Sequence, residues 1–513
     1  MKSLTHELFR KYAVAVALAV LAIGLGGFRE ASADPTGNRP NILFIAVDDL
    51  RPELDCYATS SQPIQAITPH LDGLARSGML FSRAYCNQAV CGASRLSLMS
   101  GLYPEFTGER TYHVTDWRKR WPHVVTMNQH FKANGYTAVG LGKIYHGTGG
   151  PGVDPENWSE WIQVGGKGYA NPESMKHTRE SKNHRPGGKK TKSRGPCTEA
   201  ADVADDVYSD GMRALEGARQ IKQLAAANKP FFLAVGFTKP HLPFNAPTRY
   251  WDLYQRKEFA LPENLSWPPG YPEWARNQQA GELRAYSDVP AKGTPADFPT
   301  ELNARMLHGY HACVSYTDSN VGKLLDALET ANVANNTVVV FWADHGWKLG
   351  DHSSWCKHTN FECDTRVPLM IRHPKIVAAR GESKALVELI DLYPTLCELS
   401  GLDLPRHLQG RSLVPILKDP AAGHRDYAYS SYPHTNSDTR RPVVGHSIRN
   451  ERVRYTEWWE KGSDKVVARV ATDIQADPGE TTNLLPKQKA LANQLSADLK
   501  RRVLAARETD LQK

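Results

Sequence analysis

The chain has 513 residues, of which 41% are hydrophobic and 23% are charged. This length is ample for a sizeable hydrophobic core, and it allows either one large α/β unit with a smaller companion or several domains. The formal net charge of +8 is a mild basic surplus, which gives only weak support for a polyanionic partner, and we expect no nucleic-acid partner.

The first 33 residues are typical of an export signal. Basic residues precede a short apolar run at 12–25, and Ala31-Ser32-Ala33 offers a small-residue cleavage site before Asp34. Because the apolar run is short and interrupted by glycines, a retained membrane anchor is the less favoured alternative. We therefore expect residues 1–33 to be a signal peptide and the mature protein to be periplasmic or secreted, without a stable membrane anchor.

Four short apolar runs share one pattern. Each is rich in β-branched or aromatic residues, as expected of a strand that is buried on both faces, and each ends in polar residues that can do chemistry. Ligands of open α/β sheets bind beyond the carboxyl ends of the strands, so these polar residues are expected to converge on one pocket. The runs are 41–47, 136–141, 231–235 and 337–342.

Helical patterns lie between these runs. Thr68 and Pro69 are a good N-cap and first-turn pair, Gly78 provides a stop, and an apolar stripe at helical spacing occupies 321–328. Strands that alternate with helices predict an α/β fold with a large, mostly parallel sheet flanked by helices on both faces.

The pattern of apolar residues along the sequence changes past about Asp419. Short aromatic and β-branched stretches at 427–432 and 453–459 come before a final helical segment at 488–506. We therefore expect a main domain at 34–418 and a smaller C-terminal α+β subdomain at 419–513 that carries an antiparallel sheet.

Acidic residues at two of the predicted strand ends suggest a metal site. Asp48 and Asp49 would repel each other unless a cation lay between them, and Asp344 and His345 follow another strand. Three carboxylates suit a hard divalent ion, with Ca²⁺ favoured and Mg²⁺ as the alternative. His345 leaves the identity of the ion open, because imidazole is not a ligand that calcium prefers.

Cationic and proton-transferring side chains lie near the same strand ends, and a cysteine begins a helix-like segment. Together with the metal site, this inventory suits cleavage of a tetrahedral, negatively charged ester by electrostatic stabilisation and general acid–base catalysis. The residues are Cys91, Arg95, Lys143, His146, Lys239, His241 and Lys357.

From Asn41 to about Leu485 the chain resembles the type I, formylglycine-dependent sulfatases of the alkaline phosphatase superfamily, and within them the iduronate 2-sulfatase branch. His345 and the Gly-Trp pair after it are what favour this branch. The motifs that carry the resemblance are Val47-Asp48-Asp49-Leu50-Arg51, Cys91-Gly92-Ala93-Ser94-Arg95, Gly142-Lys143-Ile144-Tyr145-His146, Lys239-Pro240-His241-Leu242-Pro243-Phe244, Ala343-Asp344-His345-Gly346-Trp347-Lys348-Leu349-Gly350-Asp351-His352, Lys357-His358-Thr359-Asn360 and Arg366-Val367-Pro368-Leu369.

The resemblance implies a role for each site residue. A maturation enzyme would convert Cys91 to formylglycine (3-oxoalanine), whose hydrate would attack sulfur. The metal would be bound by Asp48, Asp49, Cys91, Asp344 and His345. Arg95 would hold the hydrate, and Lys143 and Lys357 would neutralise the sulfate oxygens. His241, with Lys357, would protonate the leaving oxygen, and His146 would take the proton that allows sulfate to be expelled.

The resemblance also implies a substrate class. We expect an exported sulfatase that acts on a sulfated oligo- or polysaccharide, most simply an iduronate 2-sulfate or a related uronate sulfate. The alternatives are another algal or glycosaminoglycan sulfate, a phosphonate monoesterase or phosphodiesterase on the same scaffold, and a non-catalytic glycan-binding protein. Ala93 and Ser100 depart from the Pro and Thr that are commoner in the modification signature.

One segment does not fit the alternation of strands and helices. Residues 181–196 are basic and carry Pro-Gly-Gly, which predicts a flexible loop. A solvated insertion is the favoured interpretation, and recruitment of a sulfated polymer is the alternative.

Overall fold

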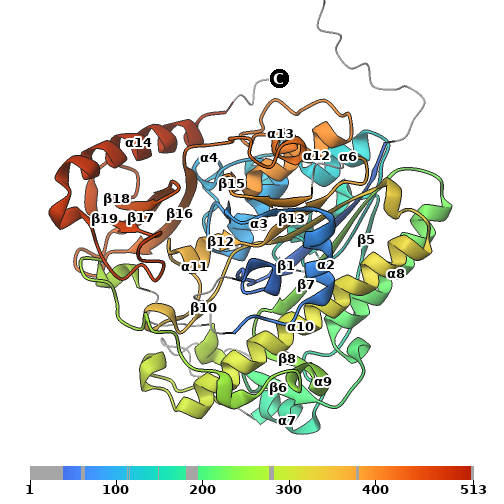
Figure 1. Ribbon diagram of the computed structural model, residues 1–513, viewed down its shortest axis with the longest axis horizontal. Helices are drawn as coiled ribbons and strands as arrows, with labels where there is room; N and C mark the ends of the chain where they lie inside the picture. The colour runs from blue at the N-terminus through green and yellow to red at the C-terminus, as the bar shows by residue number, and fades with distance from the viewer. Residues whose placement is uncertain are drawn as a thin grey trace, which may run out of the picture. The chain divides into compact units, whose positions relative to one another are not determined.

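A sheet of eight described strands lies at the centre of the fold (Figure 1). In sheet order the strands are β14 (Gly381–Ser383), β2 (Met79–Phe81), β13 (Leu369–Arg372), β9 (Thr337–Ala343), β1 (Asn41–Asp48), β7 (Phe231–Pro240), β4 (Thr137–Gly142) and β5 (Glu160–Ile162). Strands β9, β1, β7, β4 and β5 are parallel, whereas β13 runs antiparallel to β9 and β2. The four predicted strands are four adjacent strands of this sheet, β9, β1, β7 and β4, so the prediction of a large, mostly parallel sheet is confirmed.

This computed structural model describes residues 39–58, 64–112, 114, 116–147, 150–180, 194–276, 282–376 and 380–509. The predicted signal peptide lies outside the described residues, as does the predicted basic loop except for its last three residues. Both therefore stay predictions.

The central strands are buried on both faces, as their composition predicts. Every residue of β1 and β9 is buried. The ring of Phe44 in β1 lies 5.7 Å from the ring of Phe232 in β7 and 5.3 Å from that of Trp342 in β9, measured between centroids. Such a sheet needs helices on both sides to keep its apolar side chains from water.

Helices cover both faces (Figure 1). On one face α8 (Ser209–Ala226) and α2 (Pro69–Ser77) pack against α10 (Thr300–Thr330), and on the other α3 (Cys91–Ser100) packs against α6 (Met127–Ala133) and α12 (Leu392–Leu399). The predicted stripe is confirmed, because Val321, Leu324 and Leu328 are buried. Helices α8 and α10 approach closely at Gly217, where a Cβ atom would lie 2.7 Å from Cδ2 of Leu324.

A C-terminal antiparallel sheet follows, as predicted. Its strands are β16 (Ala428–Thr435), β17 (Pro442–Arg449), β18 (Val453–Glu460) and β19 (Val466–Asp473), each antiparallel to the next. The helix α14 (Lys489–Arg507) closes this part, and its buried Leu495, Leu499 and Val503 pack against Tyr429 and Tyr455 of the sheet. Residues 40–513 form a single unit, so the boundary between 418 and 419 stays a prediction.

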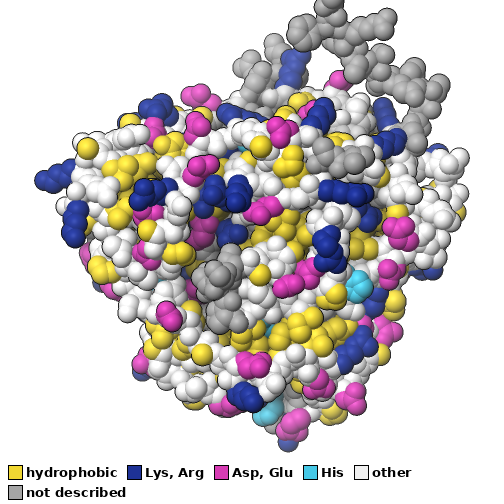
Figure 2. Space-filling view, viewed as in Figure 1, with side chains coloured by type: hydrophobic (Ala, Val, Ile, Leu, Met, Phe, Trp, Pro, Cys, Tyr) yellow, Lys and Arg dark blue, Asp and Glu magenta, His cyan; other side chains and the backbone are white. Residues whose placement is uncertain are grey.

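Shorter elements complete the described chain. They are β3 (Ala84–Tyr85), α4 (Pro104–Thr107), α5 (Trp117–Arg120), α7 (Pro172–Glu180), β6 (Thr198–Ala201), β8 (Phe244–Pro247), α9 (Thr248–Trp251), β10 (Lys348–Leu349), β11 (Trp355–Cys356), α11 (Glu362–Thr365), β12 (Arg366–Val367), β15 (Val387–Glu388) and α13 (Val414–Lys418). Among the described helices, none has the length and hydropathy needed to cross a membrane. On the face shown in Figure 2, Lys and Arg side chains are scattered among Asp and Glu side chains, in keeping with the mild charge surplus.

The parallel strands bring their polar ends to one edge of the sheet. Asp48 of β1 pairs with Pro240 of β7, and Val47 of β1 pairs with Ala343 of β9. The residues that follow these strands therefore meet at the carboxyl edge, where ligands of such sheets bind.

Candidate active site

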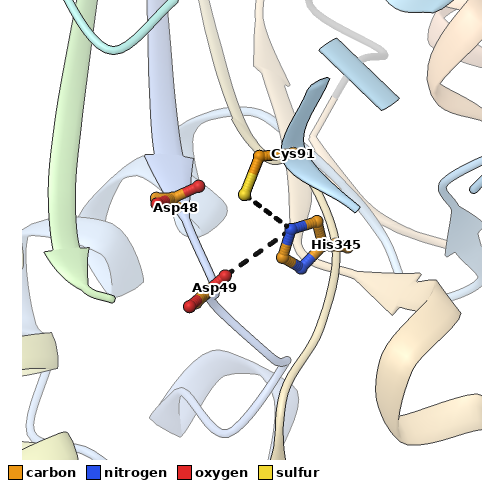
Figure 3. Close-up of side chains that lie close together, drawn as sticks. All are labelled: Asp48, Asp49, Cys91 and His345. Atoms are coloured by element: carbon orange, nitrogen blue, oxygen red, sulfur yellow. Dashed lines mark hydrogen bonds and ion pairs between the residues drawn. The ribbon is translucent and has the colours of Figure 1, made fainter. Parts of the chain in front are cut away.

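Four side chains from three distant parts of the sequence meet at the carboxyl edge of the sheet (Figure 3). Asp48 ends β1 and Asp49 follows it, Cys91 begins α3, and His345 comes two residues after β9. One ligand atom from each of the four lies within 4.8 Å of the others, and all four residues are buried. The structure therefore brings these four predicted residues together, and their role as metal ligands stays a prediction.

The orientation of His345 suits a metal ligand. Its Nδ1 lies 2.9 Å from the carbonyl oxygen of Gly346, and a proton on Nδ1 satisfies this contact. The lone pair of Nε2 then faces the cluster, 3.3 Å from Sγ of Cys91 and 3.5 Å from Oδ1 of Asp49. A backbone carbonyl that fixes the tautomer is the usual support for a histidine that binds metal. The donor set thus fits a divalent cation.

Asp344 lies at the cluster but is more heavily hydrogen-bonded than the other two aspartates. Its Oδ1 accepts hydrogen bonds from the backbone N–H groups of Asp49 and His345, at 3.2 and 2.9 Å. Its Oδ2 accepts a hydrogen bond from Nε of Arg95 at 2.8 Å and lies 3.5 Å from Nε2 of His345. Asp344 therefore positions its neighbours whether or not it also binds an ion.

Arg95 is completely buried beneath the carboxylates. Besides its bond to Asp344, its Nη2 lies 3.1 Å from Oδ1 of Asp48, and its Nη1 donates to the carbonyl oxygens of Lys143 and Ile144. A buried guanidinium that pairs with two buried carboxylates offsets their desolvation. These contacts join the ends of β1 and β9 to the loop after β4, and the predicted contact of Arg95 with a hydrate at position 91 stays a prediction.

Two lysines face the aspartates. Nζ of Lys143 forms an ion pair with Asp48 and lies 4.0 Å from Sγ of Cys91. Nζ of Lys357 lies 2.9 and 3.1 Å from the two carboxylate oxygens of Asp49. The site therefore alternates negative and positive groups, as a centre for an anionic ester requires.

The pKa values of the two adjacent aspartates are shifted in opposite directions. Burial raises the pKa of Asp49 to about 8, despite the opposing charge of Lys357 and with help from the charge of Asp48. Burial also raises the pKa of Asp48, but the charges of Lys143 and His241 hold it well below its usual value. A divalent cation between the two would relieve this repulsion.

The two predicted histidines lie near the cluster. Nε2 of His241 lies 4.0 Å from Oδ2 of Asp48 and 3.9 Å from Oδ2 of Asp49. Burial, reinforced by Lys143, lowers the pKa of His146 to about 4, so this imidazole is neutral at neutral pH. Its Nδ1 is buried and has no hydrogen-bond partner among the described residues.

Cys91 is a poor nucleophile as a thiol. It is 3% exposed, and burial together with the charge of Asp48 raises the pKa of its thiol well above the usual value. A thiol that stays protonated neither attacks nor binds metal well. The next residue, Gly92, lies against the backbone of Thr111 and Tyr112, where a Cβ atom would come within 2.6 Å of both.

Other residues of the site differ from the sequence-based expectation. Lys239 donates hydrogen bonds to the carbonyl oxygens of His241 and Pro243, so it shapes the loop that carries His241. Glu282 was missed: its Oε1 lies 2.5 Å from Nε2 of His241 and its Oε2 lies 2.9 Å from Nζ of Lys357. It lies just before a short 3-10 helix, away from any predicted strand end, so its sequence context carries no signal.

Known proteins with similar sequences are sulfatases. Residues 40–402 match the protein-family model for sulfatases, and residues 350–509 match the model for the C-terminal part of N-sulphoglucosamine sulphohydrolase. The iduronate 2-sulfatase of Homo sapiens is 30% identical over an alignment that covers 90% of this chain and 92% of the relative. A sulfatase of Formosa agariphila is also 30% identical, with coverage of 87% and 83%.

Solved structures share the fold at identities below 25%. A protein in complex with its substrate D-glucosamine-2-N,6-O-disulfate has a TM-score of 0.67 at 22% identity, covering 93% of this chain and 100% of that one. The phosphonate monoester hydrolase of Agrobacterium radiobacter has a TM-score of 0.66 at 22% identity, with coverage of 91% and 95%. The family match and the relatives confirm the resemblance seen in the motifs. The chain belongs to the sulfatase family and is a sulfuric ester hydrolase.

Proposed function

We propose that this sulfatase removes a sulfate ester from a sulfated carbohydrate, and that an iduronate 2-sulfate or a related uronate sulfate is its first candidate substrate. The observation that carries the proposal is the meeting of Cys91 with two buried aspartates and His345 at one sheet edge, flanked by Lys143 and Lys357. The substrate class is supported by two relatives named iduronate 2-sulfatase, which are 30% and 32% identical to this chain.

We assign two groups to the cluster that are not encoded in the amino-acid sequence: a divalent cation and a formylglycine at position 91. Ca²⁺, or else Mg²⁺, would be held by Asp48, Asp49, Asp344, His345 and position 91, a set in which oxygen donors dominate. A maturation enzyme would convert Cys91 to formylglycine. The cation supplies charge neutralisation, and the hydrated aldehyde supplies a nucleophile that a buried, protonated thiol cannot.

The lysines are assigned to the sulfate group. Lys143 is 4.0 Å from Sγ of Cys91 and so stands beside any group attached to or attacked by position 91. Lys357 contacts both carboxylate oxygens of Asp49. Two ammonium groups held in place before the substrate arrives stabilise the charge of the transition state without reorganising.

The histidines are assigned to proton transfer. His241 donates a proton from Nε2 to the sugar oxygen as the S–O bond breaks, since a sugar alkoxide is a poor leaving group unless it is protonated. His146, which is neutral because burial lowers its pKa, accepts a proton from position 91 when sulfate leaves. Arg95 holds Asp48 and Asp344 in place and does not take part in these transfers.

Sulfate release from defined oligosaccharides tests this proposal. The panel contains iduronate 2-sulfate, glucosamine sulfates, galactose sulfates and fucose sulfates, together with a phosphonate monoester and a phosphodiester. The mature protein is compared with Cys91→Ala. Release from the 2-sulfated uronate alone supports both chemistry and substrate. Release from another sugar keeps the chemistry and overturns the substrate, and turnover of the phosphorus esters alone overturns both.

We also propose that the protein is exported after removal of residues 1–33. The basic start, the apolar run and the small-residue cleavage site support this. The N-terminal sequence of the protein recovered from periplasm and culture medium tests it, and an intact Met1 end would contradict it.

A further inference from the structure

Glu282 is a carboxylate in a site that must accept an anion. Its side chain is 18% exposed, and its two oxygens contact two different cationic groups: Oε1 lies 2.5 Å from Nε2 of His241, and Oε2 lies 2.9 Å from Nζ of Lys357. Burial raises the pKa of Glu282, but Lys357 and His241 hold it well below its usual value, so the carboxylate is ionised. None of the roles proposed above for the aspartates, lysines, histidines and Arg95 explains the negative charge of Glu282.

The contacts of Glu282 form a chain that ends at His241. Nζ of Lys357 is fixed by both oxygens of Asp49, at 2.9 and 3.1 Å. Oε2 of Glu282 accepts a further hydrogen bond from the same ammonium group, and Oε1 contacts the imidazole of His241. The position of the imidazole is thereby tied to Asp49, and so to the cluster around Cys91.

The two nitrogens of His241 both face oxygen atoms. Nδ1 lies 2.6 Å from the carbonyl oxygen of Leu242, which can only accept a hydrogen bond. Nε2 lies 2.5 Å from the ionised Glu282, and a contact this short between two lone pairs would be repulsive. A proton must therefore lie between Nε2 and Glu282, and Nε2 is the nitrogen that faces Asp48 and Asp49.

We propose that Glu282 is a positioning residue that fixes the imidazole of His241 and holds the Nε2 proton until the leaving oxygen of the substrate accepts it. The inference rests on the proposed function, because it concerns the proton that this reaction needs. As the bond between sulfur and the sugar oxygen breaks, its electron pair stays on the oxygen, which becomes more basic than a carboxylate. The Nε2 proton then passes to that oxygen, and His241 is left neutral with its proton on Nδ1.

A different role for Glu282 makes the opposite prediction. A carboxylate between two cations could instead occupy the place of the sulfate ester and compete with it. Its removal would then tighten binding of sulfate and raise turnover. A purely structural role would lower activity whether or not His241 is present.

A double-mutant cycle separates these roles. Turnover of the sugar sulfate identified by the panel is measured for wild type, Glu282→Gln, Glu282→Ala, His241→Ala and the double variant His241→Ala/Glu282→Gln. The matched control is Glu263→Gln, which changes an exposed glutamate. Wild-type release of sulfate is the baseline, so failure of the proposed function is seen before any variant is compared.

We expect Glu282→Ala to lower kcat by roughly tenfold to a hundredfold with little change in KM, and Glu282→Gln to lower it less, since the amide keeps an acceptor oxygen. In the His241→Ala background, Glu282→Gln should cause no further loss. An equal loss in both backgrounds, no loss in either, or a gain in turnover would overturn the inference.

A measurement without turnover gives an independent answer. The proton between Nε2 and a carboxylate should give a strongly deshielded proton NMR signal in the wild-type protein. We expect this signal to be missing from His241→Ala and from Glu282→Ala and to remain in Glu263→Gln. Its persistence in Glu282→Ala would overturn the inference, whatever the substrate proves to be.

Discussion

Nε2 of His345 lies 3.3 Å from Sγ of Cys91, although the two residues are 254 positions apart in the sequence. One follows the end of β9, and the other begins α3. Asp49 completes the arrangement, 3.5 Å from the same nitrogen. An ion at this point would therefore join three separate segments of the chain, and its binding should stabilise the folded protein.

We expect Ca²⁺ to raise the midpoint of thermal unfolding and a chelator to lower it. An ion at a hundred times its dissociation constant adds about 2.7 kcal/mol of stability. The shift should be much smaller in His345→Ala and unchanged in His177→Ala, whose side chain is 53% exposed. Calorimetry with and without Ca²⁺ measures it, and equal shifts in the two variants would exclude His345 as a ligand.

Cys91→Ala should abolish sulfate release while leaving the fold intact. The substitution removes one buried sulfur atom and no ion pair, so the unfolding midpoint measured without Ca²⁺ should change little. The mass of the peptide that contains position 91 distinguishes thiol from aldehyde in the active protein. A wild-type protein that is active with an unmodified thiol would refute the assignment of formylglycine.

Arg95→Met should be strongly destabilising. It leaves the buried carboxylates of Asp48 and Asp344 without their shared partner, and breaking a buried pair in this way costs about 3–5 kcal/mol. Arg441 is the control: its partner is Glu460, its side chain is 62% exposed, and Arg441→Met should cost about 1 kcal/mol or less. Denaturant unfolding compares the two, and similar losses would mean that the buried network adds nothing.

Stability should fall as the pH drops below about 6.5, in part because of His446 in β17. Burial lowers the pKa of this histidine from 6.5 to about 3, against the opposing charge of Glu105. Folding therefore keeps His446 neutral, and the unfolded chain takes up the proton first. Its contribution is complete above pH 6.5 and is lost toward pH 3, at up to about 1.4 kcal/mol per pH unit.

Unfolding of wild type and His446→Asn between pH 4 and 7 checks this expectation. The variant is less stable throughout, but its stability should depend less steeply on pH. The same slope in both proteins would show that other groups account for the acid sensitivity.

Tyr112→Ala should raise KM for an oligosaccharide several-fold and leave kcat nearly unchanged. Tyr112 is 46% exposed, its ring centroid lies 5.8 Å from that of His146, and its backbone covers Gly92 beside Cys91. An exposed aromatic ring at this rim offers a flat apolar face for a sugar ring. Tyr112→Phe should retain the wild-type KM, and an unchanged KM in Tyr112→Ala would place the sugar elsewhere.

The sequence predicted the parts of the site that follow strand ends. Asp48 and Asp344 come directly after buried apolar runs, and parallel strands carry such residues to the same edge. Glu282 could not be found in this way, because it lies in an irregular segment whose position depends on the packing of the whole chain. The partners of Arg95 could not be predicted either, because a charged side chain within a predicted helix does not indicate which carboxylates it will contact.

The burial of Cys91 has a consequence for the proposed conversion to formylglycine. The side chain is 3% exposed in the folded chain, at the start of a helix whose second residue is covered by Thr111 and Tyr112. The proposed maturation enzyme would need access to this cysteine, and a side chain that is 3% exposed offers almost none in the folded chain. If Cys91 is converted as proposed, the conversion would belong to the interval between synthesis and folding, and a chain that folded too early would keep an inactive thiol.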